Sequence, residues 1–119
     1  MALIRTLRGI TPVIGSECFL AETAVIIGDV KLGKQCTVWY HAVVRGDVNS
    51  ITVGDCSNIQ DGAVIHCTYK RSATTIGKNV SIGHNAIVHG CTIEDDVLIG
   101  MGSIIMDDAV IGNGAFIAA

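Results

Sequence analysis

The sequence predicts an all-β protein that folds as a parallel β-helix with triangular coils of about 18 residues. The main observation is an aliphatic residue at every sixth position along most of the 119-residue chain. A period of six fits neither a helix (3.6) nor an ordinary strand (2), so internal repetition is the first feature to interpret. A small residue or a valine usually stands two positions before the aliphatic residue, and a glycine often follows it.

Each six-residue unit is expected to form a short strand and a turn, and three units close one coil. The aliphatic side chains then point into the prism, the small residues fit the inner corners, and the glycines suit bends with unusual backbone angles. Stacked coils pair as parallel strands at a spacing of about 4.8 Å. The phased aliphatic residues are Leu20, Ile26, Leu32, Val38, Val44, Val53, Ile59, Ile65, Ile76, Ile82, Val88, Ile93, Ile99, Ile105, Ile111 and Ile117.

Three irregular steps interrupt the repeat. Two long steps predict outward loops around residues 47–50 and 67–74, and one short step predicts a tightened corner near Cys91. Once these steps are absorbed, the aliphatic residues fall into three columns, one for each face of the prism. They are face A (Leu32, Val53, Ile76, Ile93, Ile111), face B (Val38, Ile59, Ile82, Ile99, Ile117) and face C (Val44, Ile65, Val88, Ile105).

The composition agrees with one domain covering residues 1–119. Half of the residues are hydrophobic, and the net charge of −3 without a basic run argues against a nucleic-acid partner. No segment approaches the roughly 20 apolar residues that span a bilayer, and residues 1–12 contain no apolar stretch of signal-peptide length. We therefore expect a soluble, cytoplasmic protein without a membrane partner.

Two further features concern the cysteines and the end of the chain. The five cysteines include no C-x-x-C pair, so neither a disulfide framework nor a zinc knuckle is predicted. The chain stops two residues after Ile117, in the middle of a repeat. An uncapped coil exposes apolar surface and unpaired backbone, so we expect a missing C-terminal segment that forms a capping helix.

The register of the repeat predicts where the histidines lie on the faces of the prism. The residue after each aliphatic residue projects outward, which puts His66 and His89 in one outward column of face C. Their Cα atoms should lie about 5 Å apart on adjacent coils, a spacing that suits two imidazoles sharing a metal ion. His84 falls on face B near a corner, with Gln60 and Asp61 one coil below it.

A neighbouring subunit could therefore present His84 to the pair on face C. Three histidines with open positions for water form the pattern of catalytic zinc, and head-to-tail contacts between prisms close as a homotrimer. Arg45 and Asp47, one coil below His66, could form an ion pair between subunits or hold an anion, and a structural salt bridge is the alternative.

Several other polar residues receive no site role. His41 matches no column. Cys67, beside His66, is an alternative additional ligand, but the sequence does not favour it in that role. The acidic runs 94–96 and 107–108 are interpreted as solvated turns.

The motifs Arg45-Gly-Asp47, Asn58-Ile-Gln60-Asp61-Gly62, the isolated His66 and Ile82-Gly-His84-x4-His89-Gly90 resemble those of γ-class carbonic anhydrases. This family belongs to the hexapeptide-repeat, left-handed parallel β-helix proteins, and the resemblance runs from about Gly9 to the end of the chain. It implies reversible hydration of CO₂ to bicarbonate by a metal-bound hydroxide at a trimer interface.

The resemblance also implies residue roles. His66 and His89 are ligands from one subunit and His84 is the ligand from the next, with one divalent metal per subunit. Zinc is the expected metal, and Fe(II) and Co(II) are the alternatives. Gln60 orients the metal-bound species, and Arg45 and Asp47 support the trimer and the site.

The chain departs from the family where the characterised enzymes carry glutamates as proton shuttles. Val48 and Asn49 follow Arg45-Gly-Asp47, and the loop after His66 is basic. Asp61 or buffer could take over the shuttle role. Two other functions stay open: a hexapeptide-repeat acyltransferase or thioesterase that acts on a CoA ester with one histidine as general base, and a catalytically silent, metal-stabilised trimeric scaffold.

Overall fold

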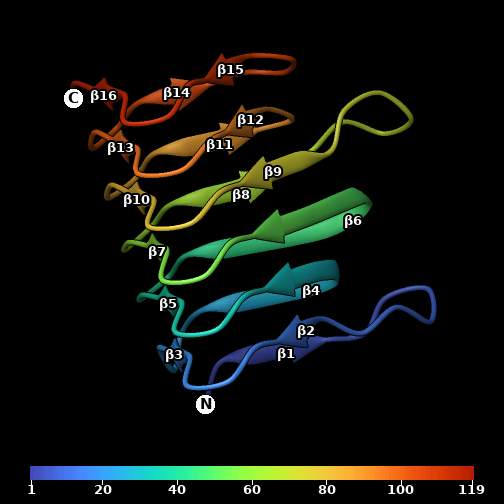
Figure 1. Cartoon of the computed structure of the whole chain (residues 1–119). Helices are drawn as coiled ribbons and strands as arrows, with labels where there is room; N and C mark the ends of the chain where they lie inside the picture. Colours follow the sequence, from blue (N-terminus) through green and yellow to red (C-terminus); the bar gives the residue numbers. More distant parts are fainter.

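The computed structural model describes residues 1–119 and shows one stack of triangular coils with strands running across the stack (Figure 1). All named strands pair in parallel, and no helix is long and apolar enough to cross a membrane. The strands are β1 (Leu3–Arg5), β2 (Val13–Ile14), β3 (Phe19–Leu20), β4 (Val25–Leu32), β5 (Thr37–Val38), β6 (Val43–Val53), β7 (Asn58–Ile59), β8 (Val64–His66), β9 (Thr74–Ile76), β10 (Ser81–Ile82), β11 (Ile87–His89), β12 (Thr92–Ile93), β13 (Leu98–Ile99), β14 (Ile104–Ile105), β15 (Val110–Ile111) and β16 (Phe116–Ile117).

The register confirms the three predicted columns. Face B is a six-stranded sheet from β3 to β16 in which Ile59 pairs with Val38 on one side and with Ile82 on the other. Faces A and C belong to one ten-stranded sheet, because β4 and β6 continue from face C round the corner to face A. On face C, Ile65 pairs with Val44 below and Val88 above.

The aliphatic columns form one continuous core. Twenty-five buried residues make up this cluster, and the side chains of Ile65 and Val88 are fully buried within it. Burying one such side chain contributes about 1.5–3 kcal/mol to the free energy of folding. The small residues fill the corners as predicted, and the hydroxyl of Ser57 donates to the carbonyl of Gly77 (2.7 Å), so this buried polar group is paired.

For the glycines that directly follow the phased aliphatic residues, the predicted reason was wrong. Their backbones do not have positive φ, and the residues that do lie two positions later: Cys56, for example, has φ 60° while Gly54 does not lie in that region. Glycines at other bends, such as Gly62, do have positive φ. Gly54 is needed for close vertical stacking instead, because a Cβ there would lie 2.5 Å from the carbonyl carbon of Gly77. No side chain fits between coils that approach so closely.

Of the three irregular steps, two were predicted correctly. Residues 67–73 form an outward loop closed by a bridge between Thr68 and Ser72, visible between β8 and β9 in Figure 1, and the corner at 90–91 is short. Residues 47–50 do not form a loop. They belong to the continuous strand β6, whose extra residues are taken up by a register shift opposite Gly28–Val30 of β4.

Candidate metal centre

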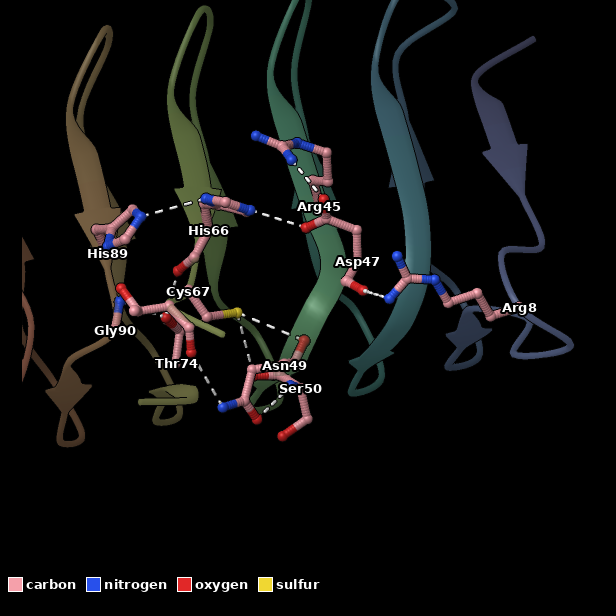
Figure 2. A network of polar contacts seen from close by, with 11 residues as sticks. Arg8, Arg45, Asp47, Asn49, Ser50, His66, Cys67, Thr74, His89 and Gly90 are labelled. Carbon is pink, nitrogen blue, oxygen red and sulfur yellow. Dashed lines mark hydrogen bonds and ion pairs between the residues drawn. The ribbon is translucent and has the colours of Figure 1, made fainter. Parts of the chain in front are cut away.

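His66 and His89 end strands β8 and β11 and are direct register partners on face C, as the sequence predicted. Nδ1 of His66 lies 3.2 Å from Nε2 of His89, and the ring centroids are 5.1 Å apart with the rings steeply inclined. Their side chains are 19% and 25% exposed, so both rings reach the surface without being fully solvated. Figure 2 shows His66 between His89 and Asp47.

The second nitrogen of each ring is held by a carboxylate. Nε2 of His66 lies 2.8 Å from Oδ1 of Asp47, and Nδ1 of His89 lies 2.7 Å from Oδ1 of Asp107. Such carboxylate partners fix the orientation and tautomer of metal-binding histidines and make the unprotonated nitrogen a stronger metal ligand. The two remaining nitrogens then face one another with their lone pairs.

This geometry fits a shared divalent cation. Two imidazole nitrogens on one tetrahedral ion, each about 2.1 Å from it, lie about 3.4 Å apart. The observed separation of 3.2 Å differs from this by only a few tenths of an ångström. When both rings donate to their carboxylates, two lone pairs this close repel each other unless a cation lies between them.

The backbone beneath the pair is held by Thr74, a buried residue at the start of β9. Its hydroxyl donates to the carbonyl of His66 (2.6 Å) and accepts from the amide of Gly90 (2.8 Å). The two histidine-bearing strands are therefore tied to each other immediately after the histidines, as Figure 2 shows. This connection limits the relative movement of the two rings.

Asp47 also binds Arg45. Its Oδ2 accepts from Nη1 of Arg45 at 2.6 Å, while Arg8 donates to its backbone carbonyl at 3.4 Å (Figure 2). Burial alone would raise the pKa of Asp47, but the hydrogen bonds from His66 and Arg45 outweigh burial and lower this pKa below its usual value. The Arg45–Asp47 pair thus forms within one chain, and its contact with another subunit stays a prediction.

His84 lies away from this pair, as predicted. It occupies the turn between β10 and β11, and its Nδ1 lies 3.1 Å from Oδ1 of Asp61. Both side chains are nearly half exposed. They border a cavity of about 480 Å³ that is lined by Thr37, Trp39, Asn58, Gln60, Asp61 and His84. Within one chain, no group of three or more His, Cys, Asp or Glu side chains is arranged to hold a metal ion.

Comparison with known proteins places this architecture in a family. The family described as bacterial transferase hexapeptide (six repeats) matches residues 11–46, 73–103 and 90–119. Gamma carbonic anhydrase 2, mitochondrial, from Arabidopsis thaliana is 43% identical over 97% of this chain and 44% of its own length. A probable carbonic anhydrase from Methanocaldococcus jannaschii is 56% identical over 72% of this chain and 54% of its own length.

The chain is a γ-carbonic anhydrase-like member of the hexapeptide-repeat family. It spans about half the length of these two relatives. Among solved structures, a hexapeptide transferase family protein from Anaplasma phagocytophilum is 39% identical, with a TM-score of 0.84 over 98% of this chain and 75% of that protein. One relative is named as mitochondrial, so the cytoplasmic location stays a prediction.

The candidate site residues of this γ-carbonic anhydrase-like chain thus lie in two separate groups. One group, on face C, contains His66, His89, Asp47 and Arg45. The other group, beside face B, contains Gln60, Asp61 and His84, which line one cavity. The amide of Gln60 donates from Nε2 to Oδ1 of Asn58 (3.0 Å), which orients it within that cavity. Sequence reasoning did not find the lining role of Thr37 and Asn58, because neither residue type stands out on an outward strand position.

The interpretation of Asp107 as a solvated turn residue was wrong. Its side chain is only 11% exposed and contacts His89, whereas that of Asp108 is 61% exposed at the surface. The sequence feature that could have indicated this contact is the position of Asp107 on the coil above Gly90, where the absence of a side chain leaves room for a carboxylate.

Cys67 lies next to His66 in the sequence but directs its sulfur to the carbonyls of Asn49 and Ser50 (3.5 and 3.6 Å), consistent with a structural role.

Proposed function

We propose that this chain is a metal-dependent carbonic anhydrase of the γ class, which interconverts CO₂ and bicarbonate at the interfaces of a homotrimer. The observation that carries the proposal is the pair of facing nitrogens of His66 and His89, 3.2 Å apart and each backed by a carboxylate. The relatives named as carbonic anhydrases support the same reaction.

In this proposal one divalent ion per subunit, with zinc preferred over Fe(II) and Co(II), is held by His66 and His89 of one copy and His84 of the next. His84 is 48% exposed at a different corner of the prism, where a second copy can approach it. Head-to-tail contact between such corners and face C repeats around a threefold axis, which gives a closed homotrimer with three sites. A three-histidine set leaves coordination positions for water and substrate.

The metal would supply one chemical effect, a fall in the pKa of bound water to about 7. The chain's own residues orient the imidazoles, bind the substrate and pass protons to solvent. Asp47 holds the imidazole of His66 in place, and Gln60, fixed by Asn58, presents an amide to a small polar substrate in the cavity beside His84. Asp61 is 44% exposed and contacts His84, so it can pass a proton to solvent in place of the shuttle glutamates of the family.

The test is CO₂ hydration by protein purified without oxygen or chelators, with metal content measured on the same sample. We expect about one metal per chain and hydration that disappears when the metal is removed and returns with it. His66→Ala should abolish both, and His41→Ala serves as the matched control, because His41 lies on an exposed turn outside both groups of site residues.

Two other results would redirect the assignment. Metal at one ion per chain without hydration would indicate the silent trimeric scaffold. Protein without metal would contradict the three-histidine site and favour acyl transfer from a CoA ester, in which a single histidine acts as general base.

A further inference from the structure

Asp107 has an unusual environment for a residue in a turn between short strands. Its Oδ1 lies 2.7 Å from Nδ1 of His89, and its Oδ2 accepts hydrogen bonds from the hydroxyls of Ser72 (2.7 Å) and Thr68. Both carboxylate oxygens are therefore bound by side chains from other coils or loops. The hydrogen bonds from Thr68, Ser72 and His89 lower the pKa of Asp107 well below its usual value.

The fold prepares the space for this carboxylate at Gly90, directly after His89. A Cβ at Gly90 would lie 2.3 Å from the hydroxyl of Ser72 and 2.8 Å from the carboxyl carbon of Asp107. The backbone of Gly90 also has φ +60° and accepts a hydrogen bond from the amide of Asp108 at 2.8 Å. Only glycine provides both the conformation and the room that the Asp107 side chain needs.

Three segments far apart in the sequence meet at this carboxylate. The loop after β8 supplies Thr68 and Ser72, the end of β11 supplies His89, and the turn after β14 supplies Asp107. The neighbouring Asp108 differs in its surroundings: it pairs with Arg71 at 2.9 Å, and both of these side chains are more than 60% exposed. Of the two adjacent aspartates, only Asp107 acts on the histidine pair.

We propose that Asp107 is a positioning residue for His89: it holds the proton on Nδ1 and directs Nε2 toward the point shared with His66. Thr68 and Ser72 fix the carboxylate in turn, so the outward loop 67–73 contributes to the site without contacting the metal position itself. The inference rests on the metal centre proposed above and extends it to a residue of the next coil.

The test compares Asp107→Ala with Asp108→Ala, a matched control that removes an adjacent carboxylate of the same kind. In metal-free protein, ¹⁵N NMR of the imidazoles should show His89 protonated on Nδ1 in the wild type and in Asp108→Ala. The Asp107→Ala variant should lose this preference. Zinc affinity should fall about 10- to 100-fold in Asp107→Ala and stay unchanged in Asp108→Ala.

The Ser72→Ala variant keeps the test decisive if Asp107→Ala does not fold, since it removes one hydroxyl and leaves both His89 and its carboxylate. It should weaken zinc binding compared with Asp108→Ala. An unchanged His89 tautomer in Asp107→Ala would overturn the inference, as would unchanged zinc affinity in Asp107→Ala or, if that variant does not fold, in Ser72→Ala. Wild-type protein that binds no zinc would instead contradict the proposed function, and the NMR comparison would still decide the role of Asp107.

Discussion

The proposed metal site needs two copies of the chain, because His84 lies at a different corner from His66 and His89. His84→Ala and His66→Ala should each abolish metal binding when prepared alone. Both residues are partly exposed, so neither substitution removes a core side chain. When the two variants are unfolded together and refolded as a mixture, some interfaces should regain all three histidines.

The size of this recovery follows from the arrangement of the site. An interface is intact only when its face C comes from a His84→Ala copy and the opposing corner comes from a His66→Ala copy. Each condition holds for about half of the copies in an equal mixture, so about one quarter of the sites should bind metal after random assembly into head-to-tail trimers. Zinc per chain, measured after gel filtration, gives the result directly.

The control is each variant refolded alone, which should stay close to zero. Mass-tagged chains would show that the mixture exchanged subunits. Recovery near zero in trimers with exchanged subunits would refute the shared site, and so would full zinc binding by either variant alone. A site built from one chain would give no recovery at all, whatever the oligomeric state.

Three other predictions concern turnover, packing and thiol access. Gln60→Ala should keep its zinc but hydrate CO₂ more slowly, because Gln60 lines the cavity beside His84; loss of zinc or an unchanged rate would contradict its role. Ile65→Ala should lower the free energy of unfolding by about 2–5 kcal/mol in urea titrations, since Ile65 is fully buried beneath the histidine pair; a loss below about 1 kcal/mol would refute the close packing. A thiol reagent should modify the exposed Cys56 in native protein and reach Cys91 only on unfolding, because Cys91 is buried and burial raises its pKa to about 11; peptide mass spectrometry showing the reverse order would contradict the fold.

The register of the prism could be predicted from the sequence because one rule governs every coil. An inward aliphatic residue fixes its neighbour as outward, so the phase of Ile65 and Val88 was enough to pair His66 with His89. The same reasoning separated His84 from them. These relations depend on periodicity alone, and they survive the insertions that the repeat contains.

Features that depend on close approach between coils could not be predicted in this way. The course of residues 47–50 depends on pairing with β4, which allows a long strand with a register shift instead of a loop. The role of Asp107 depends on the space above Gly90 and on where the loop after His66 places Thr68 and Ser72. Repeat phase gives the height of a residue in the stack but not the path of a loop.

Native mass spectrometry of the metal-loaded protein is the most direct test of a metal centre shared between subunits, because it reports subunits and bound ions in the same particle. We expect a trimer that carries three zinc ions, and a His84→Ala trimer that carries none. A monomer that binds zinc, or a trimer that keeps zinc without His84, would contradict a metal centre shared between copies.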